Sequence, residues 1–204
     1  MAVSYPRTLS ELLDIEFEES QFTLQRMHAV NTLQGGKTQV REYAPSRWRC
    51  EYTTKPMRLR RKHDLDAWWS SLRGGLETFL GYDVMRPRPV DDAAGTGGIS
   101  AGTSGGTSQR IDLTGLGSGY KISVGDYIGL RQGGAYGLFI VTNGFTGGSG
   151  SAFVEPNVIT SKFTGAATVD LRQAQGEFLP EGDLRWSRTG SMYRASFAGI
   201  QKLF

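Results

Sequence analysis

The residues that could carry chemistry are few in this 204-residue chain, and they lie apart from one another. The two histidines, His28 and His63, are far apart in the sequence, and neither belongs to an HExxH motif or to the Cys/His spacing of a zinc site. Asp64 and Asp66 follow His63, but acidic residues at the start of a predicted helix are explained by the helix dipole. No stretch has the acidic pattern of a calcium loop. The sequence therefore predicts no metal and no other cofactor.

Carboxylates and glycines give no stronger enzymatic pattern. Glu16, Glu18 and Glu19 lie close together, and Glu16 and Glu18 alternate with apolar residues, as on the solvent-facing side of a strand. A glycosidase pair of carboxylates stays open here, although nothing in the sequence selects one. Residues 97–106 are rich in glycine, but no Gly-Lys-Ser/Thr follows and no strand leads into a helix there, as a phosphate-binding loop requires. We therefore predict that the chain is not an enzyme.

The single cysteine, Cys50, alternates with Trp48 and Tyr52 on one side of a predicted strand. A thiol on the apolar face of a strand is typically buried and inert, and a lone cysteine forms no internal disulfide. A nucleophilic or redox role is the less favoured alternative. We expect the chain to fold in a reducing compartment.

A cluster of basic residues, Arg58, Arg60 and Arg61 with Lys62, is the best basic patch in the chain. A solvated surface is the simplest interpretation, and a contact with another subunit or with nucleic acid is the alternative. Because the net charge is only +3 and the basic residues form no long run, we predict no specific nucleic-acid binding. No signal-like or membrane-length apolar segment appears, which predicts a protein without a membrane span.

These residues lie on a predicted strand–helix–strand unit. Residues 48–54 alternate large and polar side chains with a period of two, as in a strand with one buried face. A short helix is predicted to begin at His63-Asp64 with Asp64 as its cap, and to end at Gly74-Gly75, where left-handed backbone is needed. A strand should follow over residues 76–82. The apolar stripe of the helix consists of Leu65, Trp68, Trp69 and Leu72.

Both ends of the chain are predicted to join this unit. Thr8–Glu11 has the spacing of a capping box before one or two helical turns. Gly35-Gly36 predicts a hairpin, which Pro45 is expected to separate from the strand that starts at Trp48. The closing segment Phe197–Phe204 is expected to return beside the N-terminal sheet. The core anchors of this part are predicted to be Trp48, Trp68, Trp69 and Trp186.

The middle of the chain has a different texture. Residues 91–108 are rich in Gly, Ser, Thr and Ala, which predicts a flexible linker. Four short strands are predicted after it, at 110–114, 121–130, 137–142 and 152–158, as in a small barrel or sandwich. The predicted fold is therefore mainly β with one short α-helix. It comprises a discontinuous, β-sandwich-like outer domain of residues 1–88 and 169–204, and an inserted β-barrel domain of residues 89–168.

Three stretches of the chain resemble the distal tail proteins of long-tailed bacteriophages. They are the strand, basic cluster, helix and exit from Ser46 to Pro87, the Val124-Gly-Asp-Tyr-Ile-Gly-Leu segment with Leu138–Thr142, and the closing segment from Tyr193 to Phe204. The resemblance implies a ring-forming outer domain and an inserted, often OB-like barrel that faces outward. It also implies a structural virion protein without catalytic residues, placed at the phage tail tip after assembly in the host cytoplasm.

The resemblance further implies which partners the chain has. Six copies are expected to form a ring between the tail tube protein and the hub protein of the tip, with the tape measure protein as a further candidate partner. From the residues themselves, Arg58, Arg60 and Arg61 are the candidate subunit contacts. Because a ring subunit meets its neighbour through two different surfaces, exposed strand edges are also expected to be completed by the neighbour.

Other interpretations stay open. The chain could be a carbohydrate- or receptor-binding β module of a tail or baseplate, or another head–tail or tail assembly protein. A single-stranded nucleic-acid binder would stack bases on the aromatic residues of the middle segment, with few basic residues to assist. Those aromatic residues are Tyr120, Tyr127, Tyr136, Phe139 and Phe145, and the basic ones are Arg110, Lys121, Arg131 and Lys162.

Overall fold

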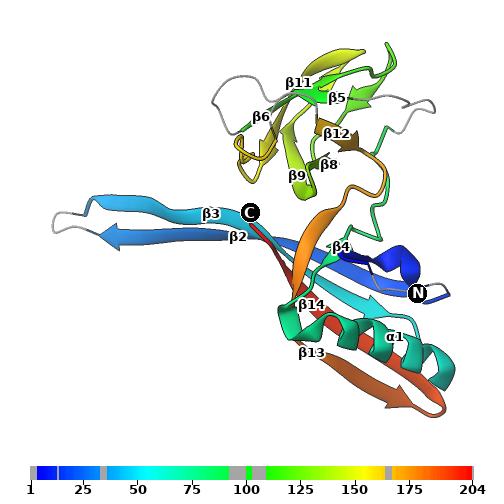
Figure 1. Ribbon diagram of the computed structural model, residues 1–204. Helices are drawn as coiled ribbons and strands as arrows, with labels where there is room; N and C mark the ends of the chain where they lie inside the picture. Colours follow the sequence, from blue (N-terminus) through cyan, green and yellow to red (C-terminus); the bar gives the residue numbers. More distant parts are fainter. Residues whose placement is uncertain are drawn as a thin grey trace.

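The computed structural model describes residues 4–12, 14–32, 36–91, 100–102, 109–163 and 167–203. These residues form a mainly β structure with one α-helix, which confirms the predicted fold class. A six-stranded sheet with the helix on one face forms one lobe, and a closed β-barrel forms the other (Figure 1). The helix covers the sheet on the side where a sandwich would place a second sheet.

The central sheet combines strands from both ends of the chain. Its order is β1 (Arg7–Thr8), β4 (Phe79–Gly81), β13 (Gly176–Thr189), β14 (Met192–Gln201), β3 (Thr38–Thr54) and β2 (Phe17–Thr32). All neighbours are antiparallel except the short pair β1 and β4. Because β14 pairs directly with β3, the prediction that the closing segment returns beside the N-terminal sheet is confirmed.

Helix α1 (Leu59–Ser71) begins earlier than predicted. Its N-cap is Arg58, so Asp64 lies inside the helix rather than at its start. The cause is a β-bridge between Met57 and Tyr193, which ends the extended chain just before a run of good helix formers, Leu59–Lys62. The predicted C-terminal stop is confirmed, because Gly74 and Gly75 both have positive φ, at 63° and 101°.

The predicted apolar stripe of the helix is confirmed. Leu65, Trp68 and Leu72 are buried, and Trp69 is half-buried. The stripe packs on aromatic residues of the sheet, with the ring of Phe197 lying 5.2 Å from that of Trp69. Before the sheet, the short 3₁₀ turn η1 (Leu9–Glu11) carries the predicted capping box, in which the Thr8 amide donates to the Glu11 carboxylate at 3.1 Å.

The predicted hairpin is confirmed, but it is longer than expected. Strand β3 runs through Pro45 without interruption. Proline is tolerated there because the β2–β3 pairing bulges between Gln25 and Met27, and because β14 pairs with β3 only from Arg49 onward. The tip of this hairpin, residues 27–32 and 38–44, therefore extends beyond the sheet as two strands alone, and we call it the arm (Figure 1).

The second lobe is a closed barrel in the order β11 (Ser149–Glu155), β6 (Arg110–Thr114), β5 (Ser100–Gly102), β12 (Ala167–Asp170), β8 (Tyr127–Gln132) and β9 (Ala135–Asn143). A small pair, β7 (Lys121–Ile122) and β10 (Phe145–Thr146), lies beside it. The prediction of a flexible linker over residues 91–108 was wrong at residues 100–102. These residues form strand β5, which pairs with both β6 and β12. The remainder of that stretch, apart from Asp91, lies outside the described residues.

The two lobes share an apolar junction. The Trp48 indole nitrogen on β3 donates to the carbonyl oxygen of Leu138 on β9 at 2.8 Å, and its ring lies 5.8 Å from that of Tyr127 on β8. Arg86, in the first connection between the lobes, donates to the Tyr127 hydroxyl at 2.6 Å. Burial raises the pKa of Tyr127 to about 12, so this ring stays neutral and can pack in the junction.

The contact between helix and sheet can be tested through Leu72, which is fully buried at the end of α1. Replacing it by alanine removes apolar contacts and leaves a cavity, so Leu72→Ala should lower the free energy of unfolding by about 2–5 kcal/mol. The matched control is Leu76→Ala, four residues on, because that side chain is 80% exposed; its effect should stay within about 0.5 kcal/mol. Urea unfolding followed by tryptophan fluorescence would measure both values, and equal effects would contradict the packing described here.

Candidate assembly surface

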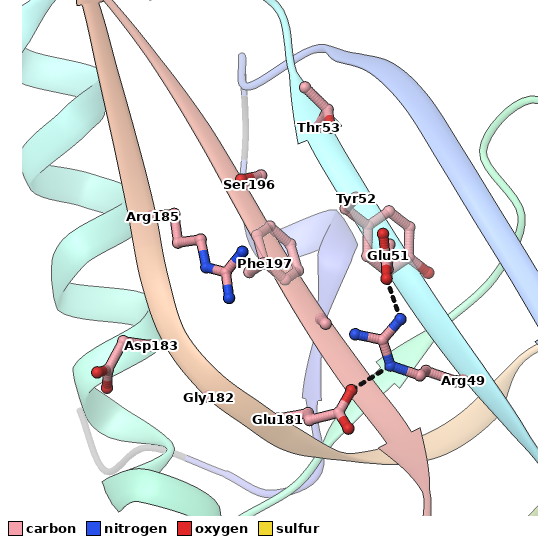
Figure 2. A pocket seen from close by; sticks show the side chains of 11 residues that line it. Arg49, Glu51, Tyr52, Thr53, Glu181, Gly182, Asp183, Arg185, Ser196 and Phe197 are labelled. Carbon is pink, nitrogen blue, oxygen red and sulfur yellow. Dashed lines mark hydrogen bonds and ion pairs between the residues drawn. The ribbon is translucent and has the colours of Figure 1, made fainter.

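The face of the sheet opposite α1 is open and polar. A hollow of about 320 Å³ lies on it, lined by residues of β3, β13 and β14 (Figure 2). It forms where the pairing of β13 with β14 is interrupted between Glu181 and Arg185. A bulge at this point spreads the strands and leaves room above the sheet.

Charges on this open face are paired. Arg49 forms ion pairs with Glu181 and with Glu51, and Figure 2 shows its guanidinium between the two carboxylates. The hydrogen bond to Glu181 contributes most to raising the pKa of Arg49. Farther along the sheet, Arg194 on β14 binds Glu18 on β2 at 2.8 Å. Because each of these arginines has an acidic partner in the same chain, this part of the face attracts anions and cations only weakly.

Two edges of the sheet, in contrast, have open backbone positions. Among the described residues β2 pairs with β3 alone, and the β2 edge is its outer side. The β13 edge is the outer side of β13 over residues 185–189, beyond the pairing with β4 and beyond the place where Gly75 approaches the Pro180 carbonyl oxygen. Neither edge is paired there, whereas exposed edges in soluble proteins are usually short, twisted or covered. They are therefore the strongest candidates for a contact with another chain.

One row of residues crosses the sheet from edge to edge. Glu19 on β2 lies opposite Thr53 on β3, Thr53 lies opposite Ser196 on β14, and Ser196 lies opposite Arg185 on β13. Directly opposed residues point to the same face of a sheet. Within the described ranges, neither Glu19 nor Arg185 has an ion-pair partner. The row thus ends in an uncompensated acid at one edge and an uncompensated base at the other.

The arm is exposed along its whole length beyond Ala44 and Met27. Val30 and Val40 are cross-strand partners, and they are 54% and 65% exposed; Tyr43 is 66% exposed. A two-stranded hairpin is at best marginally stable in water by itself. Exposed apolar residues on such a hairpin indicate a surface that another chain covers.

The three arginines predicted as subunit contacts do not lie on these edges. Arg58 precedes α1, and Arg60 and Arg61 lie in its first turn, at the end of the lobe that is remote from the barrel. Arg61 is engaged within the chain, since it binds Asp14 and Asp64. Arg58 and Arg60 differ from Arg61, because both are exposed.

The four tryptophans predicted as core anchors occupy different places. Trp48 and Trp68 are buried, the first at the lobe junction and the second between helix and sheet. Trp69 and Trp186 are half-buried. The Trp186 indole donates to Asp66 at 3.0 Å, and the Lys62 ammonium lies 4.5 Å from its ring centre, so Trp186 ties β13 to α1.

The other residues considered for chemistry are not brought together. His28 lies on the arm and His63 on α1, and Asp64 and Asp66 bind cations of their own helix. Glu16 and Glu18 bind Lys55 and Arg194. No group of three or more potential metal ligands occurs among the described residues.

The aromatic residues of the middle segment form no stacking platform. Tyr120, Tyr127 and Phe139 are buried, and Tyr136 and Phe145 are half-buried. Rings inside a core cannot stack on bases, as single-stranded nucleic-acid binding requires. These aromatic residues serve the packing of the barrel and of the lobe junction.

The sequence did not predict a contact at Arg185, and it indicated Glu19 only as one of three neighbouring carboxylates with Glu16 and Glu18. In their local sequence, Arg185 and Glu19 each look like an ordinary exposed residue of a strand. Only the strand order places them at opposite ends of one row, and that order joins segments far apart in the chain.

Comparison with known proteins does not assign this chain to a family. No family model matches this chain, and no curated protein matches it. In the described part of the chain, no helix is both long and apolar enough to cross a bilayer. The function must therefore be inferred from the surface itself.

The burial of Cys50 gives a direct test of thiol chemistry. Its side chain is fully buried and lies 3.5 Å from the carbonyl oxygen of Gly199, and burial raises the pKa of the thiol. Because the reactive thiolate is disfavoured and access is blocked, we expect no reaction of the folded protein with a disulfide reagent at mildly alkaline pH. The denatured protein, as control, should release one equivalent of chromophore. Rapid reaction without denaturant would show that the strand opens.

Proposed function

We propose that this chain is a structural virion protein that forms a ring at the distal end of a bacteriophage tail, where it connects the tail tube to the hub and fibres of the tip. The resemblance of Ser46–Pro87 and of the closing segment to distal tail proteins motivates this proposal. The observation that carries it is the pair of open edges on the central sheet, which differ in charge.

The strand directions favour edge-to-edge contact between copies. From β13 to β2 the sheet contains four strands, and each is antiparallel to the next. In this alternation β2 runs opposite to β13. When copies are related by rotation about an axis along the strands, the β2 edge of one copy meets the β13 edge of the next as an antiparallel pair. A contact between two different surfaces of this kind forms a ring when the rotation between copies closes, as we propose here.

Charge favours the same arrangement. In an unshifted register, Glu19 of one copy would lie opposite Arg185 of its neighbour, because both residues belong to one row of the sheet. Opposite charges on facing strands stabilise a sheet, and like charges destabilise it. The arm prolongs β2 and β3 beyond the sheet, so it would present its exposed valines to another chain of the assembly.

The open face suits the wall of a channel through which DNA passes. In a closed ring of such sheets, one face points inward and α1 lies on the other. The paired charges of Arg49 and Arg194 would hold DNA only weakly. Within this proposal the assembly is a homohexamer, with the tube protein, the hub protein and the tape measure protein as further partners.

A charge swap tests the proposed contact. Glu19→Arg alone and Arg185→Glu alone should each place like charges at every interface, which costs about 1 kcal/mol per interface and weakens association several-fold. The double variant Glu19→Arg/Arg185→Glu restores opposite charges and should recover most of the association. Size-exclusion chromatography with light scattering, over a range of protein concentrations, would measure the mass of the assembly.

Lys162→Glu serves as the matched control, because it reverses one exposed charge on the barrel lobe, away from the row, the edges and the arm. A wild-type protein that stays monomeric at high concentration would contradict the ring. If the double variant associated no better than the single ones, the assigned register would be wrong. A monomer that binds glycans would favour the carbohydrate-binding module instead.

A further inference from the structure

A second surface lies at the end of the central sheet remote from the barrel, where β3 ends and α1 begins (Figure 1). It is a hollow of about 500 Å³. Met57, Met192 and Pro56 form its apolar part, and Arg58 and Arg60 stand at its border with Lys55 and Arg61. We call it the methionine–arginine hollow. Methionine surfaces adapt to differently shaped apolar side chains, which suits a binding site.

The charges in this hollow do not balance within the chain. Its two acids are already neutralised, since Glu16 accepts a hydrogen bond from Lys55 at 2.8 Å and Asp14 binds Arg61. Of the described residues, none pairs with Arg58 or Arg60. The hollow therefore presents two free guanidinium groups beside an apolar surface.

The start of α1 adds to the positive potential. Its N-cap, Arg58, makes no side-chain capping bond, and the first turn contains no acidic residue. Helix N-termini favour negative charge, and basic residues there are unfavourable. Most helices carry Ser, Thr, Asp or Asn at this position. A carboxylate supplied by another molecule would offset both the dipole and the two arginines.

From this geometry we infer that the methionine–arginine hollow docks an acidic segment of a partner protein, in which an aliphatic side chain is flanked by carboxylates. The aliphatic group would enter between Met57 and Met192, and the carboxylates would bind Arg58 and Arg60. Guanidinium groups bind carboxylates with paired hydrogen bonds, which gives the contact direction as well as strength. Since the partner would belong to the assembly proposed above, this inference rests on the proposed function.

The test uses the full chain and three fluorescently labelled synthetic peptides. The probe is acetyl-Glu-Leu-Glu-Leu-Glu-amide, and the controls replace either every Glu by Gln or every Leu by Ser. Fluorescence anisotropy should show saturable binding of the probe that weakens as salt is added. Each control peptide should bind about tenfold more weakly, because one lacks the charge and the other lacks the apolar group.

Variants of the protein locate the binding site. Arg58→Glu/Arg60→Glu should weaken probe binding about tenfold or more, because attraction becomes repulsion at both positions. Lys162→Glu, an exposed charge reversal on the barrel lobe, should leave binding within about twofold. A photo-crosslinking version of the probe, used with the unaltered protein, should label residues 56–60 or Met192. This measurement keeps the inference testable if the double variant folds poorly.

Several results would overturn the inference. They are the absence of saturable binding, equal binding of the Leu-to-Ser peptide, full binding by the Arg58→Glu/Arg60→Glu variant, and crosslinks confined to other surfaces. Light scattering tells a failure of the hollow apart from a failure of the proposed ring. The Arg58→Glu/Arg60→Glu variant should still associate as the wild type does, because the hollow lies apart from the β2 and β13 edges. Loss of peptide binding with intact association supports the hollow, whereas failure of the charge swap concerns only the edges.

Discussion

The structure depends on keeping one face of a curved sheet away from water. On that face Phe79 and Phe197 pack against Trp68 of α1, and Phe22 and Trp48 pack against Tyr127 of the barrel. A helix of thirteen residues cannot cover all of it. The uncovered part is closed by Tyr127 and Leu138, which belong to barrel strands but pack in the core of the sheet. Burial of apolar area is the dominant favourable term in folding, so the barrel is held against the sheet by the force that folds the sheet.

The sequence could predict those parts of the fold that local residue patterns determine. The alternation from Trp48 to Thr54 and the helical stripe from Leu65 to Leu72 are local patterns, and each determines one face of one element. The strand β6 coincided with its predicted bounds, because Gln109 precedes the alternating pattern and Gly115 ends it. Local patterns also predicted the hairpin and the end of the helix. Glycine adopts positive φ more readily than other residues, so its position in the sequence alone indicates a turn or a helix end.

Other features depend on partners that are distant in the chain. The start of α1 is set by the bridge of Met57 with Tyr193, and residues 100–102 become a strand only because β6 and β12 lie on either side. Pro45 stays within β3 because no second strand needs its missing amide. The Glu19–Arg185 row belongs to the same class. It arises from three strand pairings, and no local pattern contains it.

Charges are distributed differently over the faces and the ends of the sheet lobe. On the open face, arginines and acids neutralise each other within the chain, as Arg49 does with Glu51 and Glu181. At the two edges Glu19 and Arg185, and at the methionine–arginine hollow Arg58 and Arg60, have no such partner among the described residues. Exposed ion pairs contribute little to stability, so this difference has little consequence for folding. Its larger effect is on which surfaces attract another molecule, and from which direction.

The sheet edges and the methionine–arginine hollow lie on different sides of the lobe. The β2 and β13 edges face sideways along the sheet, so the proposed contacts there would extend the sheet from copy to copy. The methionine–arginine hollow is lined mainly by residues between the end of β3 and the start of α1, and these two ends lie away from the barrel (Figure 1). A subunit with lateral contacts to itself and a separate axial contact to another protein can form a layer and join that layer to a different one. Because the core fixes the barrel on the sheet, each layer would present barrels at one end and hollows at the other. The same apolar face that stabilises the lobe would thereby give the proposed assembly its polarity.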